Sequence, residues 1–122
     1  MRNPKVLLVD DEADFVTALA ERLQLRKINA TIATSGEMAL EMIETDRPDV
    51  VILDIKMPGL GGLEVLHQIK GKDKSIQVIL LTGHGSTREG IEGMRLGAYD
   101  FLMKPIDIDE LINKMKELPE LK

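Results

Sequence analysis

Acidic, hydroxyl and basic side chains stand where the apolar segments of this chain end. The first apolar segment runs into the triplet DDE (residues 10–12), and later segments end at Asp54, Thr82 and Lys104. Carboxylates that lie close together repel one another, which raises their pKa values. Mg²⁺ relieves this repulsion, and it binds one or two carboxylates together with waters and phosphate oxygens. If these side chains converge, they suit phosphoryl transfer, which depends on positioning and charge neutralisation.

Asp54 is the most unusual residue of the set. It follows the apolar run VVIL (residues 50–53), which is short and dense enough to form a buried strand. A buried carboxylate is costly unless something compensates for its charge. Asp54 is therefore a candidate nucleophile that would form an aspartyl phosphate. Lys104 and Thr82 could then contact the oxygens of the phosphoryl group.

Each of these signals is weak when it is taken alone. An acidic pair after a strand is more often a charge cluster at a helix N-terminus, and a threonine at a strand end is ordinary β-sheet chemistry. A lysine before a proline is usually a solvated loop residue. The prediction depends on all of these residues occurring together, each at the end of a buried strand.

Alternation of apolar segments with segments of helical period predicts an α/β fold, a parallel sheet with helices on both faces. Strands are expected at residues 6–9, 30–33, 50–53, 76–81 and 101–103. Apolar helical faces are expected at Phe15, Val16, Leu19 and Leu23; at Met38, Met42 and Ile43; at Leu63, Leu66 and Ile69; and at Ile108, Leu111, Ile112 and Met115. Ser35 and Asp107 are expected to cap helices. Because parallel strands share one carboxyl edge, the polar residues should meet there.

Length and composition narrow the class of protein. The chain has 122 residues, 43% hydrophobic and 30% charged, which predicts a single domain over residues 1–122. The absence of cysteine excludes disulfides and thiolate metal sites. A net charge of −5 argues against direct nucleic-acid binding. No apolar run is long enough to cross a membrane, and no signal peptide is recognisable, so a cytoplasmic location is expected.

The helical segment at residues 86–96 is weak because it contains Gly90 and Gly93. Each glycine costs about 1 kcal/mol relative to alanine in a helix interior. Either a close packing contact requires glycine, or the helix is held loosely so that it can shift; the sequence does not decide between them. The helical methionines are expected to fill the core, at positions 38, 42, 94 and 115. Of the two histidines, His67 is expected to be solvated and His84 to lie at the rim of the site.

Four segments together resemble the receiver (phosphoacceptor) domain of two-component response regulators. They are VLLVDDE (6–12), VVILDIKMPG (50–59), VILLTGHGS (78–86) and GAYDFLMKP (97–105). The resemblance extends over residues 4–117, and the last two segments are most similar to receivers of the nitrogen-regulation subfamily. It implies a flavodoxin-like fold, with five parallel strands in the order 2-1-3-4-5.

The resemblance also implies how the acidic residues act. Asp54 would be the phosphoacceptor. Asp11, Asp54 and the backbone carbonyl of Lys56 would bind Mg²⁺ directly, and Asp10 would act largely through a water molecule.

The remaining polar residues would respond to the phosphoryl group. Lys104 would pair with Asp54 and later with the phosphoryl group, while Thr82 would turn inward to hydrogen-bond a phosphoryl oxygen. Phe101 would move from outside to inside in step with Thr82, and a phenylalanine here excludes a switch that relies on a phenolic hydroxyl. The resemblance also implies a cis Lys104–Pro105 bond, although only about 5–6% of such bonds are cis in folded proteins.

The function implied is a phosphorylation-dependent signalling switch that takes a phosphoryl group from a sensor histidine kinase. An output domain or protein would read the surface of the fourth helix, fifth strand and fifth helix, and phosphorylation could also drive homodimerisation. The chain would not be an enzyme acting on external substrates, since it would support only its own phosphorylation and dephosphorylation. A Mg²⁺-dependent phosphohydrolase is disfavoured because Lys56 stands where the acid/base carboxylate would be needed. A receiver-like module that binds partners without phosphorylation is the alternative.

Overall fold

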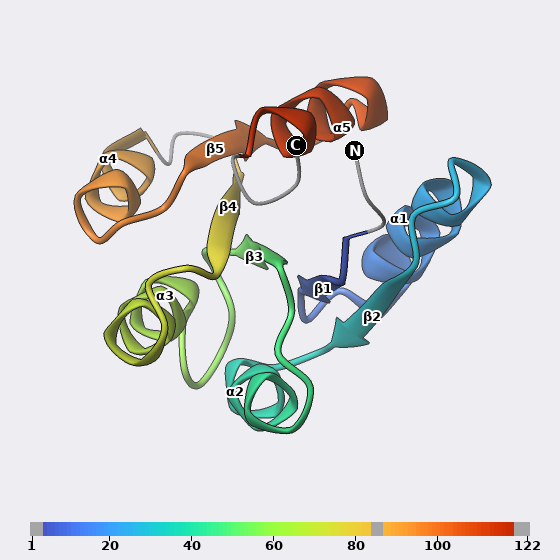
Figure 1. Ribbon diagram of the computed structural model, residues 1–122. Helices are drawn as coiled ribbons and strands as arrows, with labels where there is room; N and C mark the ends of the chain where they lie inside the picture. Colours follow the sequence, from blue (N-terminus) through green and yellow to red (C-terminus); the bar gives the residue numbers. More distant parts are fainter. Residues whose placement is uncertain (1–3, 84–86, 119–122) are drawn as a thin grey trace.

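The fold alternates strands and helices along the whole chain (Figure 1). The computed structural model describes residues 4–83 and 87–118. The strands are β1 (Val6–Val9), β2 (Ala30–Ala33), β3 (Val50–Asp54), β4 (Gln77–Thr82) and β5 (Asp100–Met103). The helices are α1 (Ala13–Leu25), α2 (Gly36–Thr45), α3 (Gly62–Lys72), α4 (Thr87–Arg95) and α5 (Ile108–Glu117). His84 and Ser86, the expected start of the fourth helix, lie outside the described residues.

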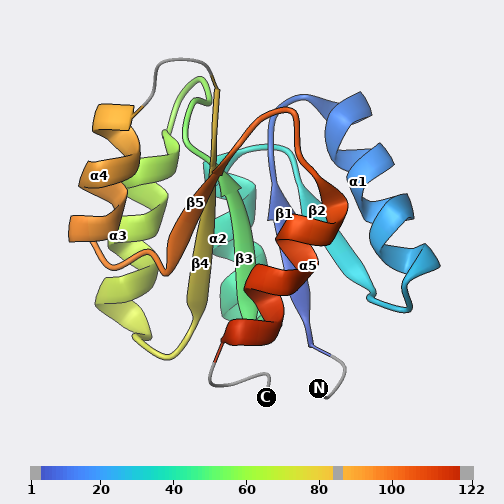
Figure 2. The same cartoon turned by 90° about the horizontal axis from the view of Figure 1, so that it is seen from above.

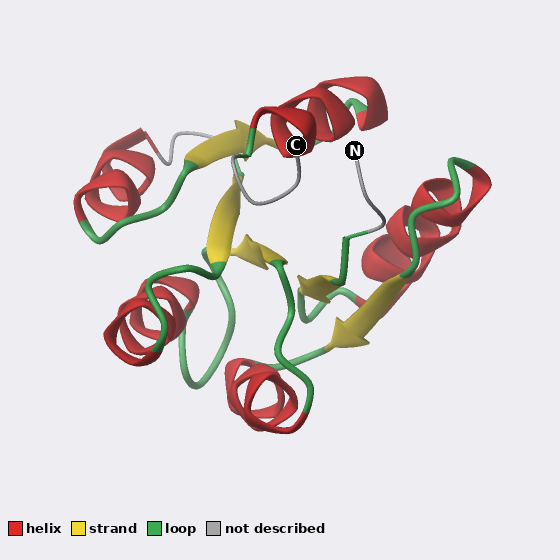
Figure 3. Ribbon diagram, viewed as in Figure 1, coloured by secondary structure: helices red, strands yellow, loops and turns green. Residues whose placement is uncertain are grey.

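The strands form one parallel sheet in the order β2-β1-β3-β4-β5, as predicted. The sheet twists between two layers of helices (Figure 3). The observed strands differ most from the expected ones at β4. It was expected at residues 76–81 and is observed at Gln77–Thr82. Asp54 belongs to β3 and pairs with Leu81 of β4, so the sheet fixes the backbone of the candidate nucleophile on the side of β4.

Two apolar clusters cover the two faces of the sheet. Residues of α1 and α5 pack against Leu8, Ile52 and Ile79 on one face, and residues of α2 and α3 pack against Leu7, Leu53 and Leu80 on the other. This division follows from the alternation of side chains along a strand. Figure 1 shows α1 and α5 on one side of the sheet, with α2, α3 and α4 on the other.

Both predicted helix caps are confirmed. The side chain of Ser35 accepts a hydrogen bond from the backbone N–H of Met38 at 3.1 Å. The side chain of Asp107 accepts hydrogen bonds from the N–H groups of Asp109 and Glu110 at 2.9 and 3.3 Å. Each cap satisfies N–H groups that have no partner within the helix.

The prediction that the helical methionines fill the core is wrong for two of them. Met115 is buried, but Met38 and Met94 are 42% and 40% exposed. In α2 the buried positions are Gly36 and Ala39, and Gly36 lies too close to its neighbours for a longer side chain. A Cβ at Gly36 would lie 2.6 Å from the Leu60 carbonyl oxygen.

Close packing explains the two glycines of α4. A Cβ at Gly93 would lie 2.1 Å from Cδ1 of Leu80, and one at Gly90 would lie 3.0 Å from the ring of Phe101. Of the two interpretations left open by the sequence, the close contact is therefore the one that the structure supports.

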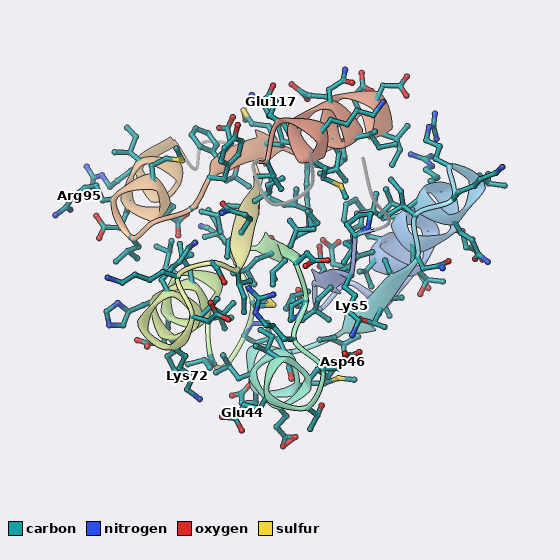
Figure 4. The ribbon with its side chains drawn as sticks, in the orientation of Figure 1. Lys5, Glu44, Asp46, Lys72, Arg95 and Glu117 are labelled. Atoms are coloured by element: carbon teal, nitrogen blue, oxygen red, sulfur yellow. The ribbon has the colours of Figure 1, made fainter. Side chains whose placement is uncertain are left out.

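Surface ion pairs join neighbouring helices away from the sheet. Lys72 of α3 and Glu44 of α2 lie 2.7 Å apart (Figure 4), and this contact lowers the pKa of Glu44. Both side chains are more than half exposed, so we assign the stability of the fold to the two apolar clusters rather than to such pairs. Among the described residues, no helix combines the length and apolar character that crossing a membrane requires.

Candidate functional site

The polar residues predicted to converge are brought to the carboxyl edge of the sheet. Asp10 directly follows β1, Asp54 and Thr82 end β3 and β4, and Lys104 directly follows β5. The backbone N–H of Lys104 donates to the carbonyl of Thr82 at 2.8 Å, which ties the ends of β4 and β5 together. Figure 2 shows the loops after β1, β3 and β5 gathered at the upper edge of the molecule.

Three carboxylates meet at this edge. One oxygen each of Asp10, Asp11 and Asp54 lies within 4.8 Å of the others. Asp10 and Asp54 are buried, at 1% and 5% exposure, whereas Asp11 is exposed. A set of hard oxygen donors that is open to solvent on one side fits a divalent cation such as Mg²⁺, which keeps several of its waters.

The surroundings of Asp54 disfavour its charged form. Burial is the largest effect and the negative charge of Asp10 is the second, and together they raise the pKa of Asp54 to about 6. The charge of Lys104 and a hydrogen bond from the backbone of Lys56 act in the opposite direction. At neutral pH the ionised carboxylate is therefore held at a cost that a bound cation would reduce.

Lys104 is held by carboxylates on two sides. Its Nζ lies 2.8 Å from Asp10, 2.9 Å from Glu12 and 3.7 Å from Asp54. Burial alone would lower the pKa of Lys104, but the hydrogen bonds with Asp10 and Glu12, together with the negative charges of Asp10 and Asp54, outweigh burial and raise it. The expected pair with Asp54 is present, but Asp10 and Glu12 are the closer partners.

Two contacts of Lys104 were not predicted from the sequence. Glu12 was noted only as part of the acidic triplet, and Phe15 only as a member of an apolar helical face. The ammonium group lies 4.4 Å from the centre of the Phe15 ring, a distance at which cation–π attraction operates. Glu12 and Phe15 lie one turn apart at the start of α1. Their spacing of three residues was the signal in the sequence that could have predicted that they share a neighbour.

The side chain of Lys56 points toward α4 rather than to the carboxylates. Its Nζ lies 3.6 Å from Glu89 of α4, and the side chain is 69% exposed. The backbone N–H of Lys56 donates to Asp54, which places the loop after β3 directly beside the carboxylates. The role of the Lys56 carbonyl as a metal ligand stays a prediction.

Thr82 and Phe101 lie on the neighbouring strands β4 and β5. Thr82 is 1% exposed and lies at the end of β4. Phe101 of β5 is partly buried against the apolar cluster that includes Leu80 and Val65. The Lys104–Pro105 bond is cis, as the resemblance implied.

Comparison with known proteins identifies the family. The family model of the response regulator receiver domain matches residues 6–116. The response regulator MprA of Mycobacterium tuberculosis is 37% identical over 114 residues, which are 93% of this chain and 50% of MprA. The chain thus spans about half the length of this relative. Sporulation initiation phosphotransferase F of Bacillus subtilis is 37% identical over 122 residues, 100% of this chain and 98% of the relative.

A solved structure has the same fold. The receiver domain of NtrX from Brucella abortus superposes with a TM-score of 0.89 at 34% identity, covering 96% of this chain and 99% of that one. This similarity agrees with the expected likeness to receivers of the nitrogen-regulation subfamily. With the family match over residues 6–116 and the acidic site at the carboxyl edge of the sheet, the chain belongs to the response regulator receiver domains of phosphorylation-dependent two-component signalling.

Proposed function

We propose that Asp54 is the phosphoacceptor and that it takes a phosphoryl group from the phosphorylated histidine of a sensor kinase. An oxygen of Asp54 attacks the phosphorus, and the phosphorus–nitrogen bond breaks with its electron pair going to the imidazole. The observation that carries the proposal is the convergence of Asp10, Asp11 and Asp54 within 4.8 Å, with the Lys104 ammonium 3.7 Å from Asp54. Negative and positive charge are both in place for a phosphoryl group.

Mg²⁺ is the proposed cofactor because the donors here are carboxylate oxygens. Asp11, Asp54 and the carbonyl of Lys56 would hold it directly, with Asp10 acting through a water molecule. Bound there, it would neutralise the carboxylates and the oxygens of the incoming phosphoryl group.

Lys104 and Thr82 are proposed to bind the phosphoryl group once it is on Asp54. Lys104 already lies near Asp54 and is 18% exposed, so exchanging Glu12 for a phosphoryl oxygen requires only a change at the tip of its side chain. The Thr82 hydroxyl is the proposed hydrogen-bond donor to a second phosphoryl oxygen. Phe101 is proposed to take its inward position together with Thr82.

The partner-binding surface is proposed to lie over α4, β5 and α5. Ile91 and Met94 of α4 and Met103 of β5 are 56%, 40% and 50% exposed, and exposed apolar side chains are a feature of protein-binding surfaces. An output domain or protein would bind this surface, or a second copy of the chain after phosphorylation. The chain would act as a single receiver domain over residues 1–122 in the cytoplasm, with no external substrate and no direct contact with nucleic acid or membrane.

Incubation with Mg²⁺ and acetyl phosphate, followed at once by intact-mass measurement, tests the proposal. We expect the wild-type protein to gain one phosphoryl group only when Mg²⁺ is present, and the Asp54→Asn variant to gain none. No gain by a protein that binds Mg²⁺ would contradict the proposal. That result would favour the receiver-like module that binds partners without phosphorylation.

A further inference from the structure

Gly90 of α4 lies directly against the ring of Phe101. A Cβ built at Gly90 would be 3.0 Å from Cδ2, 3.0 Å from Cε2 and 3.1 Å from Cγ of the Phe101 ring. Contacts this short are tighter than packed side chains normally tolerate, so the ring and an alanine could not both keep these positions. An alanine at position 90 would therefore require the ring to shift by a few tenths of an ångström.

The arrangement of α4 on the sheet explains why this contact occurs. Phe101 of β5 pairs with Leu80 of β4, so their side chains are neighbours on the same face of the sheet. Gly90 lies over Phe101, and Gly93, one turn later, lies over Leu80. Gly90 and Gly93 are both buried, while Ile91 and Met94 are exposed, so the two glycines form the face of α4 that rests on the sheet.

We propose that Gly90 is a positioning residue that holds the switch aromatic Phe101 in its inward position. This inference rests on the proposed function, in which the inward ring accompanies the phosphorylated state. Without a side chain at position 90, the ring can lie partly buried against the core.

The consequence for phosphorylation follows from linkage between the two positions. If the inward position of the ring favours phosphoryl binding by some factor, a substitution that holds the ring outward weakens phosphoryl binding by that same factor. Gly90→Ala adds a methyl carbon 3.0 Å from the ring and should displace the ring from its partly buried position. The α-helix itself would gain from the substitution, since alanine is the better helix former, so a loss of phosphoryl binding could not be attributed to a weaker helix.

The position of the ring can be observed directly by ¹⁹F NMR. The chain contains two phenylalanines and no tryptophan, so replacing phenylalanine with 4-fluorophenylalanine gives two resonances, and the Phe101→Leu variant identifies the one from Phe101. We expect Gly90→Ala to move the Phe101 resonance toward that of a solvent-exposed ring. Gly71→Ala is the matched control because a Cβ at Gly71 of α3 meets no atom within 4 Å, and it should leave the Phe101 resonance unchanged. An unchanged Phe101 resonance in Gly90→Ala would overturn the inference.

Binding of beryllofluoride, a non-covalent mimic of the phosphoryl group, with saturating Mg²⁺ gives the second measurement. We expect Gly90→Ala to weaken beryllofluoride binding at least about fivefold, the lower end of usual coupling between sites. In the Phe101→Leu background the same substitution should change affinity by less than about twofold, the limit expected for uncoupled positions. An equal loss in both backgrounds, or an unchanged affinity, would overturn the inference. A wild-type protein that binds Mg²⁺ but not beryllofluoride would overturn the proposed function, and the inference with it; unchanged Phe101 signals with normal binding would overturn the inference alone.

Discussion

At the scale of single residues, Asp54 occupies a position that penalises its own charge. Burial and the neighbouring Asp10 raise its pKa to about 6, while the sheet fixes its backbone opposite Leu81. Carboxylates with perturbed pKa values of this kind are common at functional sites. A bound cation would reduce the cost of the charge on Asp54.

Asp54→Asn is expected to stabilise the protein in metal-free buffer above pH 6. Because the pKa of Asp54 is higher in the folded state, the folded protein binds more protons between pH 3.8 and about 6, and its stability falls as the pH rises through this window. A difference of about 2 pKa units corresponds to about 3 kcal/mol. Urea unfolding of both proteins with EDTA should show the gain at pH 8 and little of it at pH 4. A gain that does not depend on pH would contradict this account.

Lys104→Met is expected to destabilise the metal-free protein because it leaves the buried carboxylates of Asp10 and Asp54 without their cation. The loss should be about 2–3 kcal/mol at pH 7.5, slightly below the range for fully buried pairs, since Lys104 is 18% exposed. The free energy of unfolding from urea titrations measures it. Mg²⁺ should restore part of the loss, because it supplies positive charge to the same carboxylates.

Lys72→Met is the matched control for Lys104→Met. Lys72 lies 2.7 Å from its partner Glu44, which is close to the 2.8 Å between Lys104 and Asp10. Both Lys72 and Glu44, however, are more than half exposed. Solvent screens such pairs strongly, so this substitution should leave the unfolding midpoint unchanged within error. If both lysine variants lost equal stability, burial of the site would not explain the effect at Lys104.

At the scale of elements, the residues of α4 that face the sheet are constrained by the side chains of the sheet. Gly93→Ala should destabilise the protein, although alanine favours the helix by about 1 kcal/mol. The added Cβ would lie 2.1 Å from Cδ1 of Leu80, a fully buried side chain, and overpacking of this kind costs about 1–3 kcal/mol. Gly71→Ala meets no neighbouring atom and should stabilise by up to about 1 kcal/mol. Opposite signs in urea unfolding are expected; a stabilised Gly93→Ala variant would show that α4 moves freely on the sheet.

The N-terminus of α2 depends on its cap. Ser35→Ala removes the oxygen that accepts a hydrogen bond from the N–H of Met38, and the expected loss is about 1 kcal/mol in the free energy of unfolding. Ser35→Asp keeps an acceptor at the same position and should retain most of the stability. Equal losses in the two variants would indicate that the cap does not contribute.

At the scale of the whole molecule, the sheet assembles a site from residues that are far apart in the sequence. Asp10, Asp54 and Lys104 follow or end different strands, and they meet because all the strands run in the same direction. The loops that carry these residues gather at one edge (Figure 2). A ligand at this edge therefore contacts β1, β3 and β5 at once and should stabilise the entire fold.

Mg²⁺ is expected to raise the stability of the folded chain in proportion to the logarithm of its concentration. Above the dissociation constant, each tenfold increase in free Mg²⁺ should add about 1.4 kcal/mol, because only the folded state brings the carboxylates together. Thermal unfolding at several Mg²⁺ concentrations, with EDTA as the metal-free reference, measures this slope. Asp11→Asn should move the onset of this rise to a higher Mg²⁺ concentration, and an unchanged onset in that variant would remove Asp11 from the metal site.

The sequence by itself determined the order of elements, the caps at Ser35 and Asp107, and the meeting of polar residues at one edge. These features depend on local patterns, since apolar runs, helical periodicity and side-chain caps act over a few neighbouring residues. The family resemblance supplied the strand order and the roles of the individual residues. The expected bounds of the strands differ most from the observed ones at β4, which begins and ends one residue later than expected.

Only the tertiary structure decided which groups touch. It placed Glu12 and Phe15 beside Lys104, turned Met38 and Met94 outward, and explained Gly90 and Gly93 by close contacts beneath α4. It also showed that burial and the charge of Asp10 act together on Asp54. These outcomes depend on distances between residues that are remote in sequence, and a packing distance or an electric field is a property of the assembled fold rather than of any local pattern.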